Sequence, residues 1–205
     1  MIYVVAALAQ LLSLMIDARH YSARETVGGG LEILIRSLRP DDVDRMAEAF
    51  EKLDPESIAL RFFGAKAGLT EADRSLIRNL DFETRVVLVA TLIESGREIV
   101  IGSGSYSRAG LDAAEIAFTV EEDYHGRGIA RRILHHLGVI ARDRGIVRFE
   151  AEVLPRNKAM LRVFTASGLP MASHLEDGTV RVTLKLSEST AQEHQSTTGD
   201  QGIRS

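Results

Sequence analysis

A glycine-rich segment between a strand-like stretch and a helix-like stretch is the feature that most constrains this chain. The segment His125-Gly126-Arg127-Gly128-Ile129-Ala130 follows an alternating apolar run at 114–120 and leads into an amphipathic run at 127–144. Two glycines allow the backbone to approach a ligand closely. The first N–H groups of a helix have no partner within the helix and attract anions. The segment therefore predicts a cradle for a phosphate group.

Hydrophobic periodicity and turn residues divide the rest of the chain into short elements. The predicted elements are a strand at 31–36, helices starting near Pro40, Pro55 and Thr70, strands at 85–93, 98–106 and 114–120, a helix at 127–144, a strand at 147–154, a helix at 155–168, and a closing hairpin at 169–186. The three consecutive strands read as an antiparallel meander. The fold class is therefore α+β, with one mainly antiparallel sheet and helices on its faces.

The length of 205 residues favours a single domain with tails. The predicted parts are an apolar N-terminal extension at 1–20, a polar linker with three glycines at 21–30, the folded domain at 31–186, and a disordered polar tail at 187–205. The apolar run 2–16 lacks the basic start of a secretory signal and is too short to span a bilayer. We expect either a native start near Met15 or a loosely attached helix, and a cytoplasmic protein without a membrane span.

Composition excludes several classes of function. A formal net charge of -4 argues against binding to the nucleic acid backbone. The absence of cysteine excludes disulfides, thiolate metal sites and a cysteine nucleophile. His135 and His136 are adjacent on a helix and point about 100° apart, so they cannot converge on one metal. We expect both at the surface or at the rim of the site, and no metal in the protein.

One reading of the glycine segment is a dinucleotide-binding turn. Gly126 and Gly128 fit the first two glycines of that motif, and Glu150 lies near the position of a ribose-binding acid. However, Arg131 stands where the third glycine belongs, and the acidic residues 121–123 would repel a pyrophosphate. The preceding strand also belongs to an antiparallel meander, which makes this reading weak.

A second reading fits better, because the turn resembles the R/Q-x-x-G-x-G/A signature of the GNAT superfamily of N-acetyltransferases. The segments 57–63, 124–130 and 152–160 are similar to the acetyltransferase domain of bacterial protein lysine acetyltransferases. The resemblance extends over 31–186 in element order. It implies the GNAT fold, in which two strands splay apart at the acetyl-CoA site.

The resemblance also implies which residues bind acetyl-CoA. The pyrophosphate is expected on the loop and first helical turn, formed by His125, Gly126, Arg127, Gly128, Ile129 and Ala130, with Arg131 just beyond. The main chain of Phe118, Thr119 and Val120 is expected to pair with the pantetheine arm like an added strand. Asn157 matches an asparagine that binds the same arm, and it also suits a helix cap. His125 replaces the usual Gln or Arg, which predicts a weaker, pH-sensitive phosphate contact.

Glu115 is the candidate general base, because it is an acidic residue in an otherwise apolar strand and matches the base of related lysine acetyltransferases. Glu150 and Glu152 on the neighbouring strand are the reserve candidates. Phe164 stands where many family members have a tyrosine that protonates the leaving thiolate. A phenyl ring cannot donate that proton, so Phe164 is expected to pack against the cofactor.

These observations predict an acetyl-CoA-dependent N-acetyltransferase acting on a primary amine. By resemblance, the acceptor is a protein lysine, and a small-molecule amine is the alternative. The missing tyrosine leaves a third possibility open, a non-catalytic domain that binds acyl-CoA and regulates a partner. We expect a monomer or a homodimer.

Overall fold

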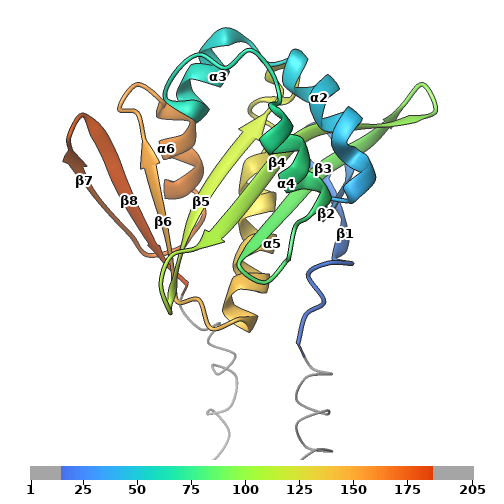
Figure 1. Cartoon of the computed structure of the whole chain (residues 1–205). Helices are drawn as coiled ribbons and strands as arrows, with labels where there is room; N and C mark the ends of the chain where they lie inside the picture. The colour runs from blue at the N-terminus through green and yellow to red at the C-terminus, as the bar shows by residue number, and fades with distance from the viewer. Residues whose placement is uncertain (1–14, 187–205) are drawn as a thin grey trace, which may run out of the picture.

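The computed structural model describes residues 15–186, so the predictions for 1–14 and for the tail at 187–205 lie outside the described residues. Figure 1 shows one twisted sheet with helices on both faces. The sheet has eight strands in the order β1-β2-β3-β4-β5-β6-β8-β7. Between residues 15 and 186, no helix is long and apolar enough to cross a membrane. The α+β class predicted from the element order is confirmed.

The element bounds follow the predicted pattern closely. The strands are β1 (Ser22–Val27), β2 (Leu31–Ser37), β3 (Arg85–Glu94), β4 (Arg97–Arg108), β5 (Ala113–Val120), β6 (Arg148–Val153), β7 (Met171–Glu176) and β8 (Thr179–Lys185). The α-helices are α2 (Val43–Glu51), α3 (Pro55–Phe62), α4 (Glu71–Arg78), α5 (Ile129–Asp143) and α6 (Lys158–Thr165). Short 3-10 turns, η1 (Pro40–Asp42) and η2 (Glu122–Tyr124), precede α2 and follow β5.

Strand pairing is antiparallel throughout the sheet except between β5 and β6. These two strands run parallel and are paired at only three positions, the last of which joins Glu115 to Glu150. Beyond this point β5 continues to Val120 and β6 to Val153 without pairing to each other. The splayed strand pair expected from the family resemblance is therefore present.

The segment 21–30 was predicted as a linker, but most of it forms a strand. Ser22–Val27 pairs with β2 over six positions, from Ser22 opposite Arg36 to Val27 opposite Leu31. Among these residues only Val27 is buried. The strand is held by main-chain hydrogen bonds at the edge of the sheet, so hydrophobic alternation does not reveal it. The three glycines form the tight turn between β1 and β2.

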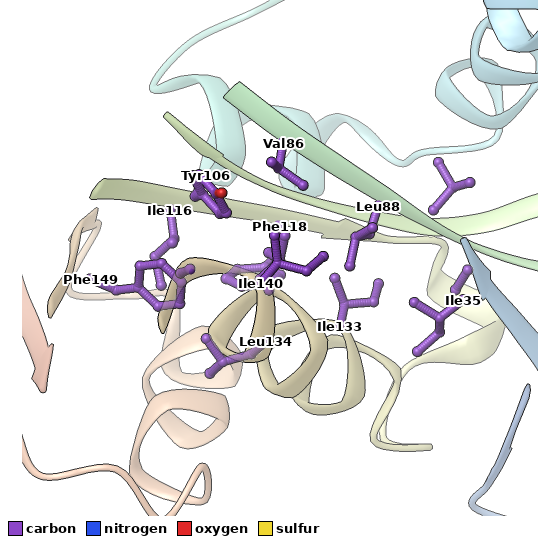
Figure 2. Packing of buried hydrophobic residues seen from close by; sticks show 14 of the residues in the cluster. Ile35, Val86, Leu88, Tyr106, Ile116, Phe118, Ile133, Leu134, Ile140 and Phe149 are labelled. Atoms are coloured by element: carbon purple, nitrogen blue, oxygen red, sulfur yellow. The ribbon is translucent and has the colours of Figure 1, made fainter. Parts of the chain in front are cut away.

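The two faces of the sheet are covered by different helices. Helices α2, α3 and α4 lie on one face, and α5 lies on the other (Figure 1). Apolar side chains fill the space between the sheet and α5, as Leu88, Phe118, Ile133 and Ile140 show in Figure 2. The helix lies so close to β4 that a Cβ atom at Gly104 would be 2.5 Å from Ile133 Cγ2. The main core therefore lies on the α5 face.

A buried cluster of charged side chains joins the sheet to the helices of the opposite face. Arg36 on β2 donates two hydrogen bonds to the Asp42 carboxylate, of 2.7 and 2.8 Å, and its Nε donates to Glu98 at 2.9 Å. The side chains of Arg36 and Asp42 are 2% and 0% exposed. A bidentate pair of this geometry offsets the cost of removing both charges from water.

Removing one member of this cluster should be strongly destabilising. We predict that Asp42→Asn lowers the free energy of unfolding by about 3–5 kcal/mol, because it leaves the buried Arg36 with only the partly exposed Glu98 as a counterion. Urea denaturation followed by circular dichroism measures this change. The exposed Asp44 in the first turn of α2 provides the control, and Asp44→Asn should change stability by less than about 0.5 kcal/mol. Equal effects of both substitutions would contradict the prediction.

The same cluster predicts loss of stability in acid. Burial pushes the pKa of Asp42 upward, but hydrogen bonds from Arg36 and from the Arg39 N–H outweigh this effect and hold it below its usual value. The hydrogen bond from Arg36 likewise lowers the pKa of Glu98. Folded-state pKa values below the unfolded ones stabilise the fold above about pH 4, and this stability is lost as pH falls further. Asp42→Asn should flatten this part of the stability–pH profile.

Candidate active site

A cavity of about 1100 Å³ extends to the region where β5 and β6 separate. Residues of β4, β5, α3, α6 and the loop before α5 line it. Every residue predicted for the site is among the lining residues: Glu115, Phe118, Thr119, Val120, His125, Gly126, Arg127, Gly128, Ile129, Ala130, Arg131, Asn157 and Phe164. The structure thus brings the predicted residues together around one cavity.

The loop before α5 presents a row of free main-chain donors to this cavity. Within residues 15–186, no hydrogen bond is made by the N–H groups from Gly126 to Arg131, and the first turn of the helix is closed by Arg132 N–H donating to Gly128 O. Gly126 and Gly128 have φ values of 73° and 87°. Most other residues disfavour this left-handed conformation, so the glycines are needed to aim the donors. The arrangement suits an anion with several oxygen atoms.

His125 has a structural role that the sequence did not reveal. Its Nε2 hydrogen-bonds to the carbonyl oxygen of Val120 at 2.8 Å, and its own N–H donates to Glu122 O. The imidazole therefore fastens the loop to the end of β5, and the row of free donors begins at the next residue. Its contact with a phosphate stays a prediction.

The β1–β2 turn supports the same loop from outside. Gly28 N–H donates to Arg127 O at 2.9 Å. A Cβ atom at Gly28 would lie 3.1 Å from Arg127 Cα, so a side chain here would push the loop backbone away by a few tenths of an ångström. Gly28 also lines the cavity. The sequence signal was the run of three glycines, which we assigned to the linker because nothing local connects it to residues about a hundred positions away.

His136 was expected at the surface, but it is buried. It is 6% exposed, its Nδ1 lies 2.6 Å from Tyr21 Oη, and its Nε2 lies 2.9 Å from Glu25 Oε1. Burial lowers the pKa of this imidazole, and the Glu25 carboxylate opposes that shift. The contacts join β1 to α5. Tyr21 and Glu25 fall in the segment predicted as a linker, so the partners of His136 could not be predicted from the sequence.

The main chain of β5 has a free edge beside the cavity. From Ile116 to Val120 the strand pairs with β4 on one side, and it has no strand partner on the side that faces β6. Asn157 lies across this opening at the start of α6. Its Oδ1 accepts from Met160 N–H at 3.0 Å, which confirms the predicted helix cap. In the described part of the chain its Nδ2 has no hydrogen-bond acceptor, so the amide can still donate to a ligand.

Glu115 lies at the point where β5 and β6 diverge. Its side chain is exposed to the cavity, and no hydrogen bond or ion pair occupies its carboxylate within residues 15–186. The reserve candidates differ, since Glu150 pairs with Arg148 at 2.9 Å and Glu152 with Arg181 at 3.3 Å. Of the three carboxylates, Glu115 is therefore the one available to a ligand.

Phe164 is buried beneath the cavity and offers no proton. It is 1% exposed, and its ring meets the edge of Phe118 with centroids 6.2 Å apart. The pair forms an apolar floor between α6 and β5. The hydroxyls that line the cavity belong to other positions, including Tyr124 beside the loop and Ser105 and Ser107 on β4.

Opposite the loop, the cavity wall contains cationic side chains from the helix face of the sheet. Arg85 on β3 donates through Nε to Ser107 Oγ at 2.9 Å, and Lys66 pairs with Asp73 at 2.8 Å. Arg61 on α3 lies over the Phe62 ring at 4.9 Å. Burial lowers the pKa of Arg61, while the charge of Glu115 opposes this shift.

The described residues contain no group of three or more histidine, aspartate or glutamate side chains arranged to hold a metal ion. The groups that the cavity offers to a ligand include the anion-binding loop, the free Glu115 carboxylate and the main chain of β5.

The comparisons with known proteins identify the class to which this arrangement belongs. Residues 32–170 match the family model described as the acetyltransferase (GNAT) domain. This match covers most of the chain, so the chain belongs to the GNAT family and is an N-acetyltransferase.

Particular relatives support this assignment. The GNAT domain of S. lividans PAT superposes with a TM-score of 0.73 at 35% identity, covering 80% of this chain and 96% of that one. An acetyltransferase of Pseudomonas aeruginosa is 26% identical over 156 residues, 76% of this chain and 84% of the relative. The acetyltransferase Pat of Mycolicibacterium smegmatis is 33% identical over 136 residues, 65% of this chain and 40% of the relative. The matched segment thus covers less than half of Pat.

The contact between Gly28 and the loop generates a test. We predict that Gly28→Ala weakens coenzyme A binding about threefold to tenfold, because the added methyl group displaces Arg127 and with it at least one donor of the row. Isothermal titration calorimetry measures the dissociation constant. Gly64→Ala is the matched control, since a Cβ atom there meets nothing within 4 Å and the residue is not in the cavity. Unchanged affinity in Gly28→Ala would show that the turn does not position the loop.

Proposed function

We propose that this chain transfers the acetyl group of acetyl-CoA to a primary amine, and that the amine is a protein lysine. The observation that carries the proposal is that one cavity contains both an anion-binding loop and a free carboxylate. Six consecutive free N–H groups lie at one part of its wall, and the unpaired Glu115 carboxylate lies at the fork of the sheet. The first feature suits a pyrophosphate, and the second suits a proton acceptor.

The cosubstrate would be bound mainly by main-chain groups. The loop from Gly126 to Arg131 would hold the pyrophosphate, and the free edge of β5 would pair with the amide groups of the pantetheine arm. The Asn157 Nδ2 group is available to donate to the same arm. The apolar Phe118–Phe164 floor supports the strand edge from below. These contacts direct the thioester toward Glu115.

The reaction requires a neutral amine beside the thioester carbonyl. Glu115 would accept a proton from the incoming ammonium group, directly or through a water molecule. The amine nitrogen then forms a bond to the carbonyl carbon, and the bond from that carbon to sulfur breaks. A free N–H group of β5 would stabilise the negative charge that develops on the carbonyl oxygen.

The leaving thiolate must be accommodated without a tyrosine at position 164. A simple thiol has a pKa of about 8.5, so a thiolate can leave and take a proton from water afterwards. We therefore propose that the reaction proceeds without a general acid at position 164. The ring instead keeps the floor of the site apolar.

Support for a lysine acceptor comes from similarity. The segments 57–63, 124–130 and 152–160 resemble the acetyltransferase domains of bacterial protein lysine acetyltransferases, and the GNAT domain of S. lividans PAT is 35% identical. A small-molecule amine is the alternative acceptor, and a screen of both kinds of acceptor decides between them.

Glu115→Gln tests the proposed base. We expect kcat to fall about 100-fold to 10,000-fold, because the amide cannot accept the proton, while the thermal stabilisation by acetyl-CoA is retained. Release of coenzyme A in the presence of lysine peptides, whole-protein lysates or small amines measures turnover. Glu152→Gln is the control, because Glu152 lines the same cavity but is paired with Arg181.

The possible outcomes separate the parts of the proposal. Absence of stabilisation at millimolar acetyl-CoA would overturn the cosubstrate assignment. Turnover that survives Glu115→Gln but is lost in Glu152→Gln would move the base to β6. Turnover with small amines and none with lysine peptides or protein lysates would replace the protein acceptor with a small-molecule one.

A further inference from the structure

Arg61 on α3 is a guanidinium group held inside the protein without a counterion in contact. It lines the cavity, and within the described residues neither a hydrogen bond nor an ion pair engages it. Its guanidinium carbon lies over the Phe62 ring, 4.9 Å from the ring centroid, in a cation–π contact. Lys66 in this wall is paired with Asp73, whereas Arg85 donates through Nε to the neutral Ser107 hydroxyl and keeps its charge. Arg61 differs from both in that none of its N–H donors is engaged within residues 15–186.

The unpaired charge of Arg61 is unfavourable in its partly buried surroundings. A guanidinium group has five N–H donors in a fixed planar arrangement that matches a carboxylate. Burial disfavours its charge, as the lowered pKa of the side chain shows. Its side chain is nevertheless partly exposed, because it borders the cavity. Any group that pairs with it must therefore arrive from the cavity.

Arg61 lies on the Glu115 side of the cavity, where the acceptor amine is expected, and not at the anion-binding loop. It belongs to α3, which packs on β5 and covers the sheet face that carries Glu115, Ser105 and Ser107. Its charge interacts with that of Glu115, although the two groups do not form an ion pair. The cavity thus places the unpaired Glu115 carboxylate and the unengaged Arg61 guanidinium near each other, a pattern that complements a molecule carrying an ammonium group and a carboxylate.

We propose that Arg61 binds a carboxylate of the substrate, so that the enzyme prefers an acceptor amine with a carboxylate beside it. In a protein acceptor this carboxylate is an acidic side chain next to the lysine. This inference rests on the proposed acetyl transfer to an amine at Glu115. The same guanidinium could instead meet a carboxylate on the acyl group, as in a dicarboxylic acyl-CoA, and the experiment below separates these two sources.

Two matched pairs of acceptors test the proposal with the whole chain. The first pair is a lysine peptide with glutamate on both sides of the lysine and the same peptide with glutamine. The second pair is lysine and 1,5-diaminopentane, which lacks only the carboxylate. We expect kcat/KM to be about tenfold or more higher for the carboxylate-bearing member of at least one pair, because a hydrogen bond to a charged group is worth that much. Arg61→Gln should remove this preference, and Arg61→Lys should retain part of it.

Control measurements distinguish recognition from damage to the fold. Arg78→Gln changes an exposed arginine of α4 that pairs with Glu71 and does not line the cavity, so it should leave every rate unchanged. Thermal stabilisation by acetyl-CoA should be the same in Arg61→Gln as in the unmodified chain. The second source of the carboxylate is tested by comparing kcat/KM for succinyl-CoA and acetyl-CoA with one neutral acceptor. A preference for succinyl-CoA that Arg61→Gln removes would support carboxylate binding with the acyl group as its source.

The result that overturns the inference leaves the proposed function standing. If acetyl transfer occurs, and Arg61→Gln lowers the rates of both members of each pair and of both acyl donors by the same factor, Arg61 has a structural role only. If the unmodified chain shows no preference for a carboxylate in any arm, the inference is likewise wrong. Failure of the proposed function looks different, because then the unmodified chain transfers no acetyl group to any acceptor.

Discussion

The structure depends on the loss of one set of hydrogen bonds, those between β5 and β6 after their third paired position. A parallel pair that continued would close the sheet and satisfy the main chain of both strands. Because the strands part, the main-chain edge of β5 from Ile116 to Val120 is left without a strand partner on one side. Glu115 is the last paired residue before the fork. A single departure from regular pairing thus creates the cavity, the free edge and the position of the carboxylate.

The two sides of strand β4 serve different purposes. One side packs against α5, and the other lines the cavity. Along it, the buried positions Gly102, Gly104 and Tyr106 alternate with half-buried serines at 103, 105 and 107. The glycines let α5 pack closely, and the serines line the cavity beneath the other helices. The serine face is polar, so it contributes less apolar burial, and the Arg36–Asp42–Glu98 cluster ties the two layers together on that side. The separation lets the polar face serve ligands while the α5 face supplies most of the apolar burial.

The sequence predicted the parts of the fold in which local pattern and tertiary environment agree. The meander, α5 and the closing hairpin carry strong periodicity, and the resemblance placed Glu115, the loop residues and Asn157 around one cavity. It did not predict β1, whose residues Ser22–Val27 are mostly exposed and owe their conformation to pairing with β2. It also missed what depends on distant contacts: the burial of His136, the support from Gly28, and the free charge of Arg61 in the cavity wall. No local rule connects residues separated by a hundred positions or more.

The attachments of β1 make the edge of the sheet part of the binding loop. Gly28 hydrogen-bonds to Arg127, and Glu25 hydrogen-bonds to His136 about two turns into α5. An edge strand is ordinarily among the first elements to open locally. Here its opening would break the hydrogen bond from Gly28 that holds the Arg127 carbonyl of the anion-binding loop. By thermodynamic reciprocity, a ligand that orders the cradle also slows the fraying of β1, so occupancy of the site can be read from amide exchange at the far edge of the sheet.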